Sequence, residues 1–229
     1  MAQRYAQRAF ALPVGATEIV FVRHGASADA VPGQPFPLSD GHGDPPLAPL
    51  GQLQAAAVAD RLAGEDVAGL FVTGLTRTVQ TAAPLAERIG VTPGVVPELR
   101  EVKLGSWEGG EFRIRVHDGD PVAMQAIAEQ RWDVIPGAET MEELAARVRR
   151  GVASIVERAG PDASAVAVVH GGIIGELCRQ ATESRPFAFI HSDNASISRI
   201  VVLPDGRWLL RSFNDVAHLA SLNGAGAQP

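Results

Sequence analysis

Residues 19–25 read Ile-Val-Phe-Val-Arg-His-Gly, a short apolar run followed by a cation, an imidazole and a glycine. The apolar run is continuous rather than alternating, which is typical of a strand buried on both faces of a parallel sheet. Two later runs, 67–72 and 163–169, have the same character. Apolar residues at helical spacing predict helices at 51–62, 76–89 and from about 141 to 155.

Strands that alternate with helices predict a three-layer α/β/α fold with a mostly parallel central sheet. Two late segments, 196–203 and 207–214, flank the turn sequence Pro204-Asp205-Gly206. This arrangement predicts an antiparallel hairpin strand at the late edge of the sheet.

The length of the chain suits one well-buried domain, which we expect to span residues 1–229. Within it, residues 1–16 are expected to form a loose N-terminal lead and residues 221–229 a flexible tail. Two stretches, 31–49 and about 105–137, are expected to be irregular, and the second of them to form a lid-like insertion.

Composition and charge limit the class of protein. The formal charge of −6 disfavours nucleic acid as a partner, because nucleic-acid-binding proteins usually carry a basic face. Cys178 is the only cysteine, which excludes an intramolecular disulfide and a cysteine-based zinc cluster. No apolar run reaches about 18 residues, so we expect no membrane-spanning helix. We therefore expect a cytoplasmic protein without a membrane partner; a homodimer is compatible with the sequence.

Arg23, His24 and Gly25 end the first strand with three groups that suit a phosphate ligand. Histidine can attack phosphorus, the guanidinium of arginine can donate two parallel hydrogen bonds to phosphate oxygens, and glycine lets the backbone approach closely. A three-residue match is weak by itself, so the interpretation depends on other parts of the chain.

Three further pieces fit the same chemistry. His170 and Gly171 follow the 163–169 strand, and Gly171 is expected to open a helix whose N-terminal amides favour an anion. Arg77 lies where the 67–72 strand gives way to a helix, and Glu101 lies further along the chain. Because ligands of such folds bind beyond the carboxyl ends of the strands, we expect these residues to meet there.

A dinucleotide-binding fingerprint is the rival interpretation of the glycines after His170. Gly172 and Gly175 match its last two glycines, but His170 stands where its first glycine belongs. The position late in the chain is also unusual for that motif, so we disfavour it.

Taken together, the motifs resemble the histidine phosphatase superfamily, in its phosphoglycerate-mutase-like group. The resemblance covers residues 18–219. Its elements are Arg23-His24-Gly25; Asp44-Pro45-Pro46-Leu47 with Gly51 and Gln54-Ala55; Leu75-Thr76-Arg77-Thr78 with Gln80-Thr81-Ala82; Glu101 with Gly105; residues 136–140; and His170-Gly171.

The resemblance implies a role for each matching residue. It makes His24 the nucleophile that takes the phosphoryl group, and Glu101 the acid that protonates the leaving oxygen and then activates water. It places Arg23, Arg77 and His170 around the phosphate oxygens. Ser27 matches a position that often touches phosphate in the family, and a turn-stabilising hydroxyl is the equal alternative.

The size of the rate acceleration explains why several residues are needed. Enzymes accelerate phosphate-monoester hydrolysis by up to about 10²¹-fold, whereas a general acid contributes about 10²–10⁴-fold. Most of the effect must therefore come from positioning and from charge directed at the phosphoryl group. We expect activity at mildly acidic to neutral pH, with no cofactor and no metal.

Departures from the mutase pattern favour a phosphatase that acts on a small phosphorylated molecule. Asp29-Ala30 stands where similar mutases carry Trp-Asn, Gly172 stands where they carry Asn, and their Lys and Arg-Arg substrate clamp is not recognisable. The segment 105–109 instead resembles broad-range phosphatases of the group. A mutase and a non-catalytic phospholigand-binding module stay as alternatives.

The substrate itself cannot be identified from the sequence. Four residues in or near the predicted lid have the charge to contact a second anionic group, but we expect them to be solvated. They are Arg113, Arg115, His117 and Arg131.

Overall fold

A six-stranded sheet forms the centre of the molecule, in the computed structural model that describes residues 5–223. The strand order is β5-β4-β6-β1-β7-β8. The strands are β1 (Thr17–Arg23), β4 (Gly69–Val72), β5 (Gly94–Val95), β6 (Ala163–Val169), β7 (Ile197–Val202) and β8 (Trp208–Asp215). The first four in chain order run parallel, while β7 and β8 are antiparallel. The mostly parallel sheet and its late hairpin are therefore confirmed.

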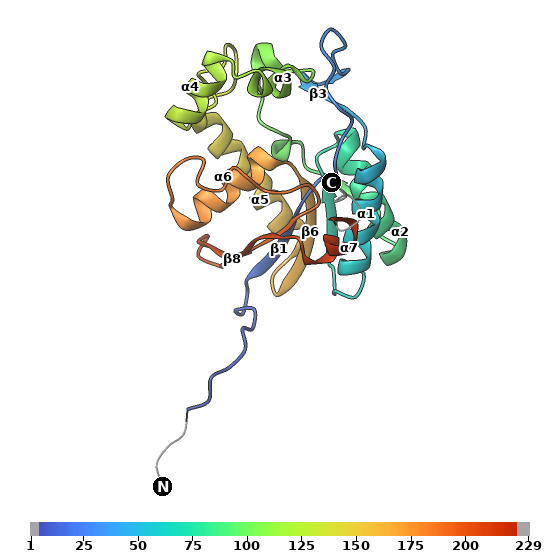
Figure 1. Cartoon of the computed structure of the whole chain (residues 1–229). Helices are drawn as coiled ribbons and strands as arrows, with labels where there is room; N and C mark the ends of the chain where they lie inside the picture. The colour runs from blue at the N-terminus through green and yellow to red at the C-terminus, as the bar shows by residue number, and fades with distance from the viewer. Residues whose placement is uncertain (1–4, 224–229) are drawn as a thin grey trace.

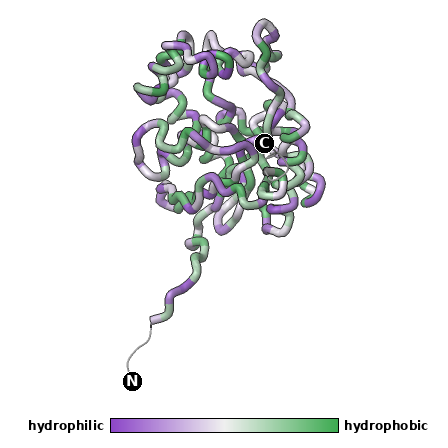
Figure 2. Tube along the Cα trace, viewed as in Figure 1, coloured by the Kyte–Doolittle hydropathy of each residue, from purple (hydrophilic) through white to green (hydrophobic). Residues whose placement is uncertain are grey.

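Helices cover both faces of this sheet (Figure 1). Ile19 and Phe21 of β1 face α5 (Met141–Ala159) and α6 (Gly171–Thr182), and Val20 and Val22 face α1 (Pro49–Leu62) and α2 (Thr76–Ile89). β1 is apolar at consecutive positions because each face has its own helical layer. Figure 2 shows the hydrophobic residues gathered in the middle of the body. The three-layer α/β/α prediction is confirmed.

The segment 105–137, expected to be irregular, is largely helical, so that expectation is wrong. It contains a short 3₁₀ turn η2 (Gly105–Trp107), α3 (Glu111–His117) and α4 (Pro121–Glu129). Helices α3 and α4 lie at the top of Figure 1. The Asp120 side chain caps α4 by accepting a hydrogen bond of 2.8 Å from Val122 N. Phe112 of α3 packs between Trp107 and Trp132. Whether this segment acts as a lid stays a prediction.

The segment 31–49 is mostly irregular up to the first turn of α1, with a small hairpin of β2 (Leu38–Ser39) and β3 (His42–Gly43). The remaining short elements are η1 (Pro97–Leu99), η3 (Ala217–Leu219) and α7 (Ala220–Asn223).

The N-terminal lead extends from the base of the body in Figure 1, and residues 5–13 form no helix or strand. Phe10 in this lead lies under the guanidinium of Arg211, and Arg211 Cζ is 3.4 Å from the centroid of the Phe10 ring. Residues 1–4 and 224–229, which include most of the predicted tail, lie outside the described residues.

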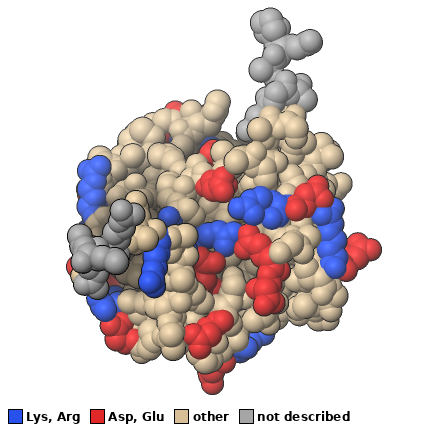
Figure 3. All heavy atoms as spheres, turned by 90° about the horizontal axis from the view of Figure 1, so that it is seen from below, with Lys and Arg blue, Asp and Glu red and all other residues tan. Residues whose placement is uncertain are grey.

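Basic and acidic side chains are interspersed on the face that Figure 3 shows. Within the described part of the chain, no helix combines the length and the apolar character that a bilayer crossing requires.

Candidate functional site

Three neighbouring parallel strands deliver polar side chains to one place at their carboxyl ends. His24 follows β1, Thr73 follows β4 and His170 follows β6. The strand register continues one residue beyond β1, because His24 N donates a hydrogen bond of 3.0 Å to Val169 O. As a result the two imidazole rings lie edge to face, with centroids 5.2 Å apart.

The loop after His24 is held by hydrogen bonds to side chains of α1 and α2. Gly25 N donates to Thr81 Oγ1 at 3.0 Å, and Ala26 N donates to Gln54 Oε1 at 2.8 Å. A Cβ atom on Gly25 would lie 2.5 Å from Gly51 O, so only glycine allows this approach. These contacts give a structural reason for the glutamine and threonine of the two helical motifs, for which the sequence predicts no role.

Hydrogen bonds define which nitrogen of His24 carries its proton. Nδ1 lies 2.8 Å from Gly25 O, and because a carbonyl only accepts, Nδ1 must be the protonated nitrogen. Nε2 lies 3.2 Å from Arg77 Nε and accepts its hydrogen bond. Burial lowers the pKa of His24 well below its ordinary value, and the charges of Arg77 and Arg23 lower it further. His24 therefore presents an unprotonated Nε2 at neutral pH.

His170 is fully buried and is connected to a chain of hydroxyl groups. Its Nε2 lies 2.9 Å from Thr73 Oγ1, which lies 3.2 Å from Thr78 Oγ1. Thr78 Oγ1 in turn donates to Leu75 O at 2.7 Å. If Nε2 carries the proton, every contact in this chain has one donor and one acceptor. Among the described residues, Nδ1 has no hydrogen-bond partner. Burial lowers the pKa of His170 well below its ordinary value, and the charge of Arg77 adds to this.

Asp44 holds Arg77 and the helix that carries it. Leu75, at the start of α2, has no side chain that can cap a helix. The Asp44 carboxylate replaces it, accepting from Thr76 N at 2.7 Å and from Thr76 Oγ1 at 2.8 Å. The same carboxylate lies 3.8 Å from Arg77 Nη1, which also donates to Gly43 O at 2.9 Å. Arg77 is thus held through Nε by His24 and through Nη1 by Gly43 and Asp44, and only 6% of its surface is exposed.

Arg23 lies on the other side of the site. Its Nη1 donates to Ser192 O, and among the described residues its buried Nε has no partner. A Cβ on Gly171 would lie 3.3 Å from that Nε, so the start of α6 packs closely on the guanidinium. Burial lowers the pKa of Arg23.

Glu101 lies against the N-terminus of α6. Its Oε1 accepts from Val102 N at 2.9 Å, and its Oε2 is 3.4 Å from Gly172 N. This position places a carboxylate beside the histidines and arginines without an ion pair to any of them within 4 Å among the described side chains. Glu101 is therefore part of the site.

We predict that Gly172→Ala lowers kcat, because the added Cβ would lie 2.6 Å from Glu101 Oε1 and 2.6 Å from Val102 Cγ2. Displacing a reacting group by about 1 Å can cost about a hundredfold in rate. Gly175→Ala is the matched control on the same helix, since its nearest contact, Phe189 O, is 3.3 Å away. Steady-state kinetics with thermal melting of both variants make the measurement. An unchanged kcat for Gly172→Ala would contradict the placement of Glu101.

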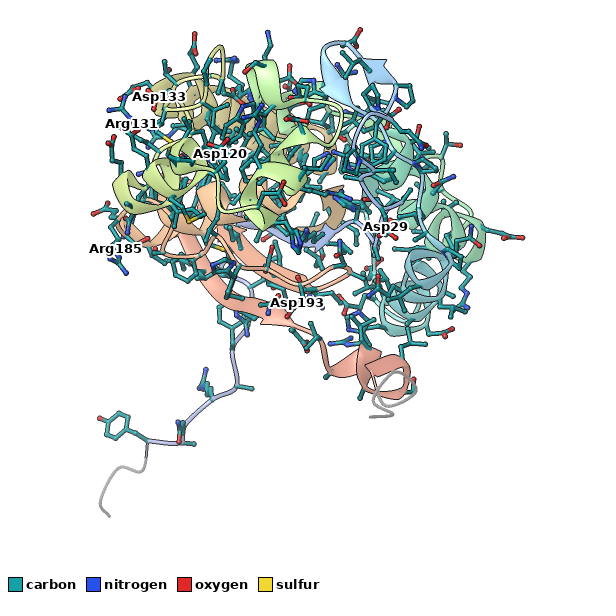
Figure 4. All side chains as sticks on the ribbon, turned by 45° about the horizontal axis from the view of Figure 1, so that its top comes forward. Asp29, Asp120, Arg131, Asp133, Arg185 and Asp193 are labelled. Atoms are coloured by element: carbon teal, nitrogen blue, oxygen red, sulfur yellow. The ribbon has the colours of Figure 1, made fainter. Side chains whose placement is uncertain are left out.

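Arg113, one of the lid residues expected to be solvated, is exposed but also contacts another part of the chain. Arg113 Nη2 donates to Ser27 Oγ at 2.7 Å, so Arg113 reaches the loop that follows His24. Arg115 instead pairs with Glu111 and Asp120 on its own side of the molecule. Arg131 pairs with Asp133, and Figure 4 shows both of them far from Asp29, which follows the His24 loop.

The seven site residues of the sequence-based prediction lie in one region, and their chemical roles stay predictions. They are His24, Glu101, His170, Arg23, Arg77, Ser27 and Gly171. Sequence reasoning missed the contributions of Asp44, Thr73 and Asn194, the last of which donates to His24 O at 3.0 Å through Nδ2. For Asp44 a signal existed, because a helix that starts after leucine needs a cap from elsewhere.

The two buried histidines also predict how stability depends on pH. Both have a folded-state pKa well below the value of about 6.5 in the unfolded chain. The unfolded state therefore binds more protons as pH falls, and the stability present above about pH 6.5 is lost below it. The limiting slope for each ring is about 1.4 kcal/mol per pH unit well below pH 6.5, and the mean slope between about pH 7.5 and about pH 5.5 is about half of that.

Urea unfolding at about pH 7.5 and about pH 5.5 measures this slope. The variant His170→Asn should show a smaller decrease than wild type in this range, while the other histidines whose pKa is lowered in the folded state, His24, His42 and His218, keep their share. A variant that keeps the full wild-type slope would show that His170 takes up its proton in the folded state.

An uncharged, unprotonated imidazole nitrogen beside two arginines and a carboxylate suits the transfer of an anionic group. Over residues 5–223, no three His, Cys, Asp or Glu side chains are grouped as the ligands of a metal ion would be.

Comparisons with known proteins find similar sequences and structures over most of the chain. The profile of the histidine phosphatase superfamily (branch 1) matches residues 19–216. A metal-independent phosphoserine phosphatase from Arabidopsis thaliana is 29% identical over 90% of this chain and 84% of that protein. A probable phosphoglycerate mutase from Yersinia enterocolitica is 29% identical over 88% of this chain and 94% of that protein. The structure of a mycobacterial glucosyl-3-phosphoglycerate phosphatase with inorganic phosphate is 28% identical, with a TM-score of 0.70 over 89% of this chain and 99% of that one.

Proposed function

The chain belongs to the histidine phosphatase superfamily (branch 1), and from this membership we propose that it hydrolyses phosphate monoesters through a phosphohistidine on His24. One observation carries the assignment of the nucleophile. The lone pair of His24 Nε2 lies in a buried site, 3.2 Å from the guanidinium nitrogen of Arg77. Attack on an anionic phosphoryl group needs this combination of a neutral nucleophile and adjacent positive charge.

In the first step, Nε2 gives up the hydrogen bond from Arg77 Nε, its lone pair forms a bond to phosphorus and the ester P–O bond breaks. The leaving oxygen takes the electron pair of that bond and the proton of the Glu101 carboxyl group. In the second step, the Glu101 carboxylate takes a proton from water while the water oxygen attacks phosphorus. The P–N bond breaks, its electron pair returns to Nε2, and inorganic phosphate leaves.

Positive charge and fixed donors stabilise the phosphoryl group in both steps. Arg77 is already held by Asp44 and Gly43, and Arg23 by Ser192, so neither has to be ordered when the substrate binds. With its proton on Nε2, His170 keeps Nδ1 as an unpartnered acceptor among the described residues, so this nitrogen contacts a phosphate oxygen only where that oxygen carries the proton. Arginine suits this task because it stays charged at any relevant pH.

Water is proposed as the final acceptor because the groups that would hold a second substrate are not recognisable. A side chain at position 172 would meet Glu101, so the asparagine of similar mutases cannot be accommodated there without moving the acid. Small phosphorylated metabolites are the proposed substrates, as the names of the two phosphatase relatives suggest.

The deciding experiment measures phosphate release from a panel of phosphomonoesters, with and without a chelator. Release from several monoesters and negligible interconversion of 2- and 3-phosphoglycerate is the expected result. Stoichiometric interconversion of the two phosphoglycerates would make the chain a mutase. Complete loss of activity with the chelator would overturn the expectation that no metal is needed.

A further inference from the structure

Arg113 connects a distant part of the chain to the nucleophile loop. It lies in α3, between η2 and α4, and its side chain reaches across to the segment that follows His24. There Nη2 donates to Ser27 Oγ at 2.7 Å and Nη1 donates to Ala28 O at 2.9 Å. The guanidinium also lies 5.7 Å from the ring centroid of Phe36.

The contact decides what the Ser27 hydroxyl can do. A guanidinium only donates hydrogen bonds, so Ser27 Oγ must accept from Arg113. The single proton of the hydroxyl is then left over, and none of the described groups accepts it. Ser27 is buried, and its loop is tied to the strand-like segment before α1, since Ala28 N donates to Pro46 O at 2.9 Å. Because buried polar groups are normally hydrogen-bonded, this hydroxyl is available to donate to a bound ligand.

Positive charge also accumulates around this hydroxyl. Arg113 stands near Arg23 and Arg77, and its charge contributes to lowering the pKa of both, after their burial. Three guanidinium groups around one site repel one another until an anion binds between them. The positive charge of the three arginines and the unused proton of Ser27 therefore both favour binding of an anionic oxygen.

We propose that Arg113 is a positioning residue of the phosphate site, which holds the Ser27 hydroxyl as a donor to the phosphoryl group. This inference rests on the proposed function for its ligand, an inorganic phosphate or phosphoryl group. It resolves the two roles open to Ser27 in favour of phosphate contact. It also gives the α3 segment a part in binding the group that all substrates share.

The test measures binding of inorganic phosphate by calorimetry, together with KM and kcat for p-nitrophenyl phosphate. Arg113→Met and Ser27→Ala should each weaken phosphate binding about tenfold, since each loses a hydrogen bond to a charged partner. The double variant should bind no more weakly than about the Arg113→Met variant alone, because both changes remove the same donor. The effect should fall mainly on KM, with a smaller change in kcat.

Arg115→Met is the matched control, since Arg115 lies on the same helix and pairs with Glu111 and Asp120 away from the loop. It should leave phosphate binding unchanged, and Arg113→Lys should recover part of the loss. Equal weakening by Arg115→Met would mean that only the fold of α3 matters and would overturn the proposal. Unchanged phosphate binding in Arg113→Met, or effects that multiply fully in the double variant, would also overturn it.

Direct binding keeps this test separate from the proposed function. A wild-type protein that binds phosphate but hydrolyses no monoester would refute the hydrolase assignment, and the variants would still report on Arg113. If the wild type is active and Arg113→Met binds phosphate as tightly as the wild type, only the role of Arg113 is refuted.

Discussion

Replacing His24 by alanine is expected to lower kcat for p-nitrophenyl phosphate by more than about a thousandfold, because the variant has no nucleophile to carry the phosphoryl group. The binding groups stay in place, since Arg77 is held by Gly43 and Asp44 independently of the imidazole. Inorganic phosphate should therefore still bind, even though turnover stops.

The covalent intermediate gives a second readout. Wild-type protein quenched during turnover should carry one phosphoryl group that is labile to acid, as a phosphohistidine is, and His24→Ala should carry none. His24→Gln, which keeps a polar side chain of similar size, controls for the loss of packing. Turnover at the wild-type rate in either variant would remove His24 from the nucleophile role.

Glu101→Gln is expected to give the second-largest effect, a decrease of about 10²–10⁴-fold for an alkyl phosphate, because its leaving oxygen needs a proton. For p-nitrophenyl phosphate, which has a good leaving group, the first step should be less affected. The second step should stay slow with both substrates, since the amide cannot take a proton from water.

This difference predicts a burst in the Glu101→Gln variant. Rapid mixing with p-nitrophenyl phosphate should release one nitrophenol per enzyme molecule, followed by slow turnover while the phosphohistidine accumulates. Glu98→Gln, a nearby change outside the site, should behave as wild type. If Glu101→Gln slows the first and second steps equally for both substrates, Glu101 acts only through its charge and not by proton transfer.

Much of the site was predictable because the chemistry follows the ends of recognisable strands. Continuous apolar runs predicted β1 and β6. Because the carboxyl ends of neighbouring parallel strands lie at one edge of the sheet, His24 and His170 come together there. The roles of Asp44 and Thr73 were not predictable in this way. Each acts through a hydrogen bond to a partner whose position depends on how loops and helices pack. The leucine before α2 signalled only that a cap must come from elsewhere, and no local pattern identified Asp44 as its source.

The role of Arg113 was missed for a different reason. α3 has seven residues and no buried side chain, so its own pattern is too weak to identify it as a helix. It is held by Phe112 packing between two tryptophans. Its neighbour α4 did carry a local signal, since Asp120-Pro121 combines a capping side chain with proline at the first helical position.

The position of β1 in the sheet has a consequence for how the protein acquires its activity. β1 lies near the start of the chain, but its two neighbours, β6 and β7, both come from the last third. The loop that follows His24 therefore cannot reach its final position until almost the whole chain is available. Pairings between strands so far apart in sequence form slowly. During synthesis, the emerging N-terminal part has an apolar strand with no partner, which is a hazard for aggregation. Catalytic competence and protection of that strand should arise in the same late folding step.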